Sequence, residues 1–210
     1  MGSSILAFEE AVADAATGDV WLFRGRSLAD RAIQAVTNSP VNHVGMVVAL
    51  DDLPPLLWHA ELGSSLPDVW TAKHQRGAQL HRLVDAAETW VNRYGQSAYF
   101  RQLTPTVSAE AENDALAVVA ENSGRRFPST GSLARRWLLG RVRRGVSLED
   151  MYCAELVAIT YQRMGLLGDE RPPNWYDPGR FWSGDRIEMV PPFALAGEVE
   201  VAQPPASTTS

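Results

Sequence analysis

Apolar and polar positions alternate along several short stretches of the chain, in the period of two that is typical of strands. Residues 19–23 are apolar on both faces, and residues 43–50 are rich in valine, so both stretches predict strands. Residues 56–62 predict a third strand, antiparallel to the second because the connection between them is short. Its alternation places Leu57, His59 and Glu61 on one face and Trp58 and Ala60 on the other. Residues 79–84 and 98–103 predict two further strands.

Helical periodicity and capping residues predict the helices between these strands. The segments are residues 4–16, 27–37 and 85–94, a helix capped by Ser108 that ends near Ser123 and Gly124, and residues 153–164, closed by Gly165. The pattern at residues 147–150 is a competing start for the last helix, six residues earlier. That start would put Cys153 in the second turn. The later start is favoured here, with the earlier one as a separate short turn.

Composition and charge restrict the class of protein. The chain has 210 residues, of which 45% are hydrophobic and 21% are charged, as expected of a soluble globular domain with one core. The net charge of −6 argues against a nucleic-acid binder. The N-terminus lacks the pattern of a secretory signal, and no apolar run is long enough to span a bilayer. We therefore expect a cytoplasmic protein.

Positive charge is concentrated in one segment of this acidic chain. Residues 122–148 hold no acidic residue and seven arginines, namely Arg125, Arg126, Arg135, Arg136, Arg141, Arg143 and Arg144. One interpretation is a solvated helical face. The other is a peripheral membrane contact through residues 125–144, because Trp137 and several leucines lie among the arginines.

The single cysteine, Cys153, is the strongest candidate for chemistry. One cysteine cannot form an internal disulfide, and it gives no metal-ligand spacing with the scattered histidines, so no metal site and no cofactor are expected. A thiol near a helix N-terminus and beside an imidazole is activated as a nucleophile. His43 at the start of one predicted strand and His59 on the next supply the base and its orienter in such a triad. His74 and His81 have no evident partner and are interpreted as surface or ordinary sheet residues.

The chain resembles the circularly permuted branch of the NlpC-type papain-like superfamily, in particular its YiiX/YebB-like members. The matching segments are residues 18–25, 32–40, 43–48 and 152–157, together with the loop around residues 177–181. The resemblance implies an α+β fold in which the helix bearing the nucleophile packs on a central antiparallel sheet. The histidine precedes the cysteine here, which is the order of the permuted branch.

The resemblance implies a role for each site residue. Cys153 would be the nucleophile, its backbone N–H would help to hold the oxyanion, and His43 would be the general base and then the acid. The third position, often a glutamate in YiiX-like proteins, falls on His59, as in the lecithin:retinol acyltransferase-like relatives, and Glu61 on the same face is the alternative orienter. Tyr152, Trp175 and Tyr176 are candidate substrate-binding residues near the thiol, although the aromatic cluster around the last two is better interpreted as core.

Three functions remain open at this point. The first is a thiol hydrolase acting on an amide or ester, the second an acyltransferase or thioesterase acting on lipid with the same triad, and the third a non-catalytic binding module. The substrate would be a small molecule, a peptide or a lipid. The expected organisation is an N-terminal helix in residues 1–17, the permuted papain-like domain in 18–190 with a basic helical insertion around 105–148, and a tail in 191–210 whose end is disordered.

Overall fold

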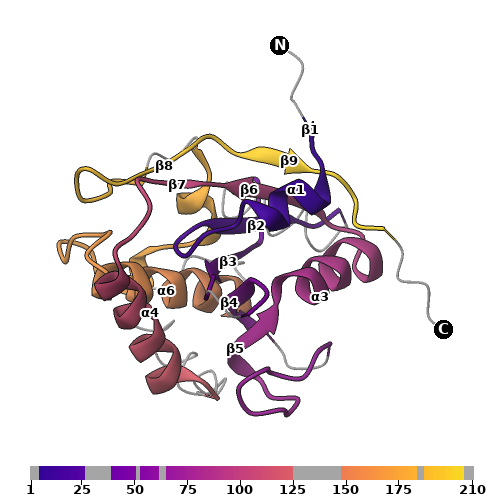
Figure 1. Cartoon of the computed structure of the whole chain (residues 1–210), viewed down its shortest axis with the longest axis horizontal. Coiled ribbons are helices and arrows are strands. Elements are labelled where there is room, and N and C mark those ends of the chain that lie inside the picture. The colour runs from indigo at the N-terminus through magenta and orange to yellow at the C-terminus, as the bar shows by residue number, and fades with distance from the viewer. Residues whose placement is uncertain are drawn as a thin grey trace.

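The computed structural model describes residues 5–26, 39–50, 53–61, 65–124, 148–183 and 187–205 (Figure 1). Three predicted features fall outside these ranges. They are the helix at residues 27–37, the arginine-rich segment 125–144 and the end of the predicted tail. Within the described ranges, no helix has the length and apolar character that a bilayer span requires.

A seven-stranded sheet forms the centre of the structure, in the order β1-β9-β6-β2-β3-β4-β5. Its strands are β1 (Ile5–Leu6), β2 (Val20–Arg24), β3 (His43–Val48), β4 (Leu56–Glu61), β5 (Gly77–Arg82), β6 (Ser97–Arg101) and β9 (Val199–Val201). Neighbours are antiparallel, except that β1 runs parallel to β9. The α+β class and the antiparallel centre of the sheet are thus as predicted, and the whole sheet is mixed. A separate pair joins β7 (Leu103–Thr104) to β8 (Ala194–Leu195).

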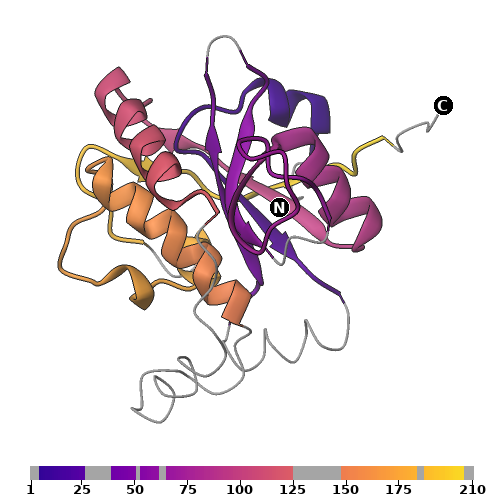
Figure 2. The ribbon, with the colours of Figure 1, turned by 90° about the horizontal axis from the view of Figure 1, so that it is seen from below.

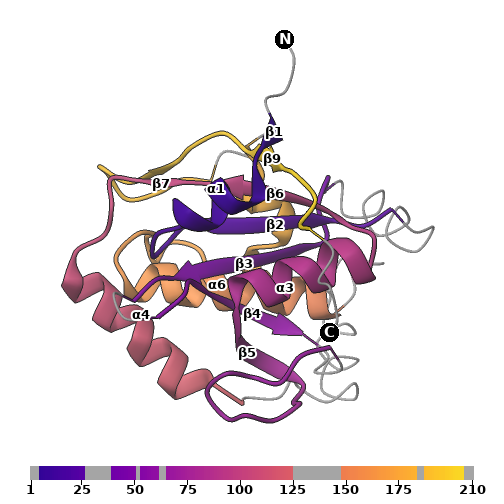
Figure 3. The ribbon, with the colours of Figure 1, turned by 45° about the vertical axis from the view of Figure 1, so that its right-hand side comes forward.

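Helices cover both faces of this sheet (Figure 2). One side carries α4 (Ala109–Asn122) and α6 (Leu148–Arg163), followed by the short helical turns η2 (Pro173–Trp175) and η3 (Pro178–Phe181). The other side carries α1 (Phe8–Ala13) and α3 (Leu83–Glu88), which continues into the π-helical turn η1 (Thr89–Arg93). Figure 3 shows α1 and α3 in front of the sheet and α6 behind it.

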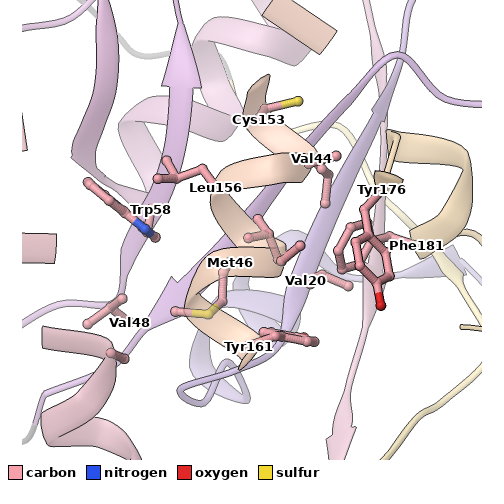
Figure 4. Close-up of a cluster of buried hydrophobic side chains, with 14 of the residues drawn as sticks. Val20, Val44, Met46, Val48, Trp58, Cys153, Leu156, Tyr161, Tyr176 and Phe181 are labelled. Atoms are coloured by element: carbon pink, nitrogen blue, oxygen red, sulfur yellow. The ribbon is translucent and has the colours of Figure 1, made fainter. Parts of the chain in front are cut away.

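Each face of the sheet has its own hydrophobic core. The core under α6 contains Val44, Met46, Trp58, Leu156 and Tyr161, several of which are drawn in Figure 4. The core under α1 and α3 contains Trp21, Phe23, Leu57, Leu83 and Trp90. Alternate residues of β2, β3 and β4 therefore point to opposite cores, which is the alternation that the sequence predicted for residues 56–62.

The ends of the described chain belong to the main sheet, which differs from the predicted organisation. Residues 191–210 were expected to be a tail, but β9 lies between β1 and β6 as a strand of the sheet. Residues 1–17 were expected to be a helix alone, but β1 precedes a shorter α1 and forms the sheet edge. Strands of two or three residues give too short an alternation to be recognised in sequence.

The other edge of the sheet, β5, is covered by the loop around Asp68. Oδ2 of Asp68 accepts a hydrogen bond from the backbone N–H of Leu80 (2.7 Å), and the N–H of Val69 donates to the carbonyl of Leu80 (2.7 Å). Oδ1 of the same carboxylate accepts from the N–H of Thr71 (2.7 Å). Asp68 is fully buried, so it holds this loop against β5 from inside the structure.

Candidate functional site

Three imidazoles form a hydrogen-bonded row across β3, β4 and β5. Nε2 of His43 lies 3.0 Å from Nδ1 of His59, and Nε2 of His59 lies 2.8 Å from Nδ1 of His81. The strand register explains the row. Met46 pairs with Trp58 and Leu57 pairs with His81, so each ring is a diagonal neighbour of the next on one face of the sheet.

The residue opposite His59 on β3 is Gly45, and its lack of a side chain makes room for the row. A Cβ at this position would lie 2.7 Å from Cδ1 of Leu57 and 3.1 Å from Cβ of His59. Both distances are shorter than packed carbon atoms tolerate. Gly45 is therefore required by close approach, not by backbone conformation.

Substitution of Gly45 by alanine should disturb the row and the core beside it. We expect Gly45→Ala to lower the free energy of unfolding by about 1–3 kcal/mol, because the new methyl group must displace Leu57 and His59. Urea unfolding of the purified variant measures this. Gly197→Ala is the matched control, since a Cβ there meets nothing within 4 Å. Equal stability of the two variants would contradict the packing argument.

The row is buried against aromatic rings. The ring of His43 stacks on Trp90 with centroids 5.1 Å apart, and the ring of His59 meets the same indole edge-on at 5.1 Å. Burial, and to a smaller extent the charge of a protonated His81, lowers the pKa of His43 to about 3. Burial likewise lowers the pKa of His59 well below its usual value, and that of His81 to about 4, where the Asp68 carboxylate partly opposes the shift.

The row is therefore neutral near pH 7, and its protons must be ordered. In each N–H···N bond one ring donates and the other accepts, and a neutral imidazole has only one proton. The whole row consequently donates in one direction, either from His43 toward His81 or from His81 toward His43. One end then carries a bare nitrogen and the other an N–H.

The predicted contact between His43 and His59 is present in the structure. Glu61 ends β4 and accepts a hydrogen bond from the hydroxyl of Ser65 (2.7 Å). His81 was wrongly interpreted as an ordinary sheet residue. Its alternation with Gln79 was visible in the sequence, but only the register of β4 against β5 reveals that it meets His59.

The helix that carries Cys153 begins earlier than predicted. It starts at Leu148, directly after Ser147, so the capping pattern at residues 147–150 marks the true start. Cys153 is the sixth residue of α6 and lies in the second turn. Only the first four N–H groups of a helix lack an intrahelical acceptor. The expected contributions of the helix N-terminus and of the Cys153 N–H to an oxyanion site are therefore lost in this conformation.

The Cys153 side chain lies in the core under α6, where it is fully buried and close to Val44 (Figure 4). His43, the residue before Val44, points to the opposite face of the sheet, where it contacts Phe23 and Trp90. The structure thus brings two members of the predicted triad together and does not show the third beside them. The catalytic role of Cys153 stays a prediction.

The candidate substrate-binding residues are divided between core and surface. Tyr176 is buried in the core under α6, as the core interpretation predicted, and Tyr152 packs partly buried against it. Trp175 is 38% exposed, with the guanidinium carbons of Arg171 and Arg180 lying 4.8 and 4.2 Å from its ring centre. Trp175 and Tyr176 line a pocket of about 300 Å³. Their role in substrate binding stays a prediction.

Metal ligation does not account for the row. Among the described side chains, no group of three His, Cys, Asp or Glu residues converges as a metal ion would require. The facing nitrogens of the row are joined to one another by hydrogen bonds and do not point at a shared centre. The arrangement is suited to holding and moving protons.

Comparison with known proteins shows a likeness to a solved structure. No family model matches the chain, and no curated protein matches it. The crystal structure of metalloprotein YiiX from Escherichia coli O157:H7 aligns with 71% of this chain at 19% sequence identity and a TM-score of 0.47. The chain is similar to YiiX in structure. The alignment covers 66% of YiiX, just under two thirds of its length.

Proposed function

We propose that this chain is a thiol hydrolase that cleaves an amide or ester bond, with Cys153 as nucleophile, His43 as general base and His59 as orienter. The observation that carries the proposal is the hydrogen bond between Nε2 of His43 and Nδ1 of His59 (3.0 Å). It fixes the orientation of one imidazole by another, as the third member of a nucleophile–base–orienter triad does. It also leaves Nδ1 of His43 as the nitrogen available to a thiol. The permuted papain-like topology is part of the same proposal.

Each step of the reaction conserves its protons. The Sγ–H proton of Cys153 passes to Nδ1 of His43, and the thiolate adds to the carbonyl carbon of the substrate. His43 returns that proton to the leaving nitrogen or oxygen as the C–N or C–O bond breaks, which leaves an acyl-enzyme. Water then loses a proton to His43 and releases the acid, and the thiol is restored.

The low pKa of His43 fits this scheme under one condition. A ring that is neutral at pH 7 is free to accept a proton, but burial makes it a weak base. A thiolate formed beside the ring would raise the pKa of His43, because opposite charges at short distance stabilise each other. The proton transfer therefore depends on contact between sulfur and imidazole.

The proposal requires such contact between Sγ of Cys153, which is buried in the core under α6, and the ring of His43. Val44 and Cys153 belong to the same core, and β3 starts at His43, one residue earlier. The sulfur and the His43 ring therefore lie near the same end of β3, on opposite faces. Catalysis requires these two groups to meet beyond the start of this strand when substrate is bound.

Alkylation by iodoacetamide tests the proposal, because the chain has one cysteine and every thiol adduct falls on Cys153. We expect the native protein to be labelled near neutral pH, and His43→Ala to be labelled at least roughly tenfold more slowly, since the base is lost. His74→Ala, at an exposed histidine, is the matched control and should keep the rate of the unsubstituted protein. Equal rates in all three proteins would refute the triad.

A second candidate function is a binding module without catalysis. It is favoured by the complete burial of the thiol and by its place in the second turn of α6. Under this alternative, labelling of Cys153 follows global unfolding. Its rate would then rise with urea in parallel with the unfolded fraction and would be the same in the His43 and His74 variants at equal stability.

A further inference from the structure

His81 is a buried titratable residue that the proposed reaction does not use. Its Nδ1 bonds to His59, and its Nε2 is buried without a hydrogen bond to any part of the chain that the structure describes. The side chain is 1% exposed, so water does not generally solvate this nitrogen. A third imidazole in this position has consequences for the other two.

Two oxygen-bearing groups next to His81 favour a proton on its outer nitrogen. The backbone carbonyl of Leu66 and the carboxylate of Asp68 both stabilise the protonated ring. Leu66 and Asp68 line the same pocket as His81, and Nδ1 faces His59, so Nε2 is the nitrogen on which they act, although neither is hydrogen-bonded to it. The carboxylate carries a negative charge and the carbonyl oxygen a partial one, and a proton on Nε2 is therefore favoured over a bare nitrogen.

A proton on Nε2 of His81 sets the direction of the entire row. Nδ1 of a neutral His81 must then accept from Nε2–H of His59, and Nδ1 of His59 must accept from Nε2–H of His43. Nδ1 of His43 is left with its lone pair. This is the nitrogen that a general base needs, at the end of the row nearest to the start of β3.

We infer that His81 is a positioning residue that sets the tautomers of His43 and His59, and that it is the terminal acceptor of positive charge in a three-imidazole proton relay. The inference deepens the proposed function and rests on it for the catalytic use of the relay. The order of the tautomers does not depend on the reaction, and rests on the hydrogen-bonded row and on the groups beside His81.

The relay conserves protons at every position. A proton that binds Nδ1 of His43 makes this ring a cation. The Nε2 proton of His43 then moves to Nδ1 of His59, and the Nε2 proton of His59 moves to Nδ1 of His81. His43 and His59 end neutral with their tautomers reversed, and His81 ends as the imidazolium. The reverse sequence returns the proton through His43 to a leaving group.

The surroundings of His81 favour charge at that end of the row. Asp68 from the loop that covers β5 stabilises the cation, whereas a protonated His74 would oppose it. His81 also lines a pocket of about 310 Å³ together with Asp68, Arg82 and Asp85. At the other end, the His43 ring is stacked on an indole and lies among apolar side chains. A charge that moves to His81 thus moves toward the Asp68 carboxylate and away from the indole of Trp90.

Imidazole ¹⁵N NMR of the full chain tests the order of tautomers directly, because a protonated and a bare ring nitrogen have separate chemical shifts. Near pH 7 we expect His43 and His59 to be protonated at Nε2 and bare at Nδ1. In His81→Asn, Oδ1 replaces Nδ1 as an acceptor and the order should persist. In His81→Phe no acceptor remains, and the order should be lost. His74→Asn is the matched control.

Alkylation of Cys153 by iodoacetamide across a pH series separates positioning from charge acceptance. His81→Phe should slow the reaction by roughly tenfold or more near pH 7, because a wrong tautomer cannot take the thiol proton. His81→Asn should retain much of the rate, but its profile should shift to higher pH because the charge stays on His43. A His43 ring protonated at Nδ1 in the unsubstituted protein would overturn the inference.

The failures of the two proposals are distinguishable. If the tautomers are as expected but the labelling rate does not depend on His43, the thiol hydrolase and the catalytic use of the relay are disproved. The positioning role of His81 is then left intact. Labelling that depends on His43, with tautomers and pH profile unchanged in His81→Phe, would sustain the hydrolase and disprove the role of His81. His81→Asn keeps the test usable if His81→Phe does not fold.

Discussion

Acidification from about pH 7 to about pH 4 is expected to destabilise the folded chain by several kcal/mol, because three of its four histidines are buried as neutral rings. In the unfolded chain a histidine takes up a proton near its ordinary pKa of 6.5. In the folded chain burial lowers the pKa of His43 to about 3 and that of His81 to about 4. Each pKa unit corresponds to about 1.4 kcal/mol.

The sign of this effect follows from which state binds more protons. Between the unfolded and folded pKa values of a histidine, the unfolded chain is the more protonated state, so stability is present above 6.5 and is lost as the pH falls. Asp19 acts in the opposite direction. Burial raises its pKa from 3.8 to about 6, so its contribution is present below 3.8 and is lost as the pH rises through 6. The combined effect of the three imidazoles on the free energy of unfolding outweighs that of this single carboxyl group.

Urea unfolding at a series of pH values measures the effect. His59→Leu removes the central ring and should flatten the dependence of unfolding free energy on pH between about 6.5 and 4. His74→Leu, at an exposed histidine that acts on His81 only weakly and through its charge, should change the slope far less. A slope that is the same in all three proteins would mean that the row does not govern acid unfolding.

Trp58→Ala should cause the largest loss of stability among single substitutions in the core under α6. Trp58 is fully buried on β4, and its indole Nε1 donates to Oγ1 of Thr160 on α6 (3.2 Å). Truncation leaves a cavity between sheet and helix and removes this bond, at a cost of about 3–5 kcal/mol. Urea or thermal unfolding provides the measurement.

Trp70→Ala is the matched control for Trp58→Ala, since Trp70 is 60% exposed. The same change of side chain there should alter the free energy of unfolding by less than about 0.5 kcal/mol. A small effect at Trp58, or effects of similar size at both positions, would show that α6 is not held on β4 as described.

Local patterns in the sequence predict much of this fold. The alternation in residues 56–62 correctly separates the face that bears His59 from the face that bears Trp58, because successive side chains of a regular strand point to opposite faces. The hydroxyl of Ser108 accepts from the N–H of Ala111 (3.3 Å), which confirms the predicted cap of α4. Gly165 follows α6 with a positive φ of 72°, as a helix-ending glycine does.

Properties that depend on contacts between distant segments were predicted less well. The meeting of His81 with His59 depends on the register of β4 against β5, and register is set by packing over the whole sheet. Whether Cys153 meets His43 depends on which face of the sheet α6 covers. The matching sequence segments contain both residues, but they do not show on which face of the sheet each residue lies. Two local sequence patterns predicted different starts for α6, and the observed start agrees with the capping pattern.

The buried carboxylate at β5 also bears on how molecules of this chain behave toward one another. An uncovered outer strand offers its free amide and carbonyl groups to a strand of another molecule, which is a common route to aggregation. Oδ2 of Asp68 and the N–H of Val69 already occupy the outward groups of Leu80. An intermolecular strand would have to expel a buried acidic side chain before it could add to the sheet here, and this strongly disfavours polymerisation through β5.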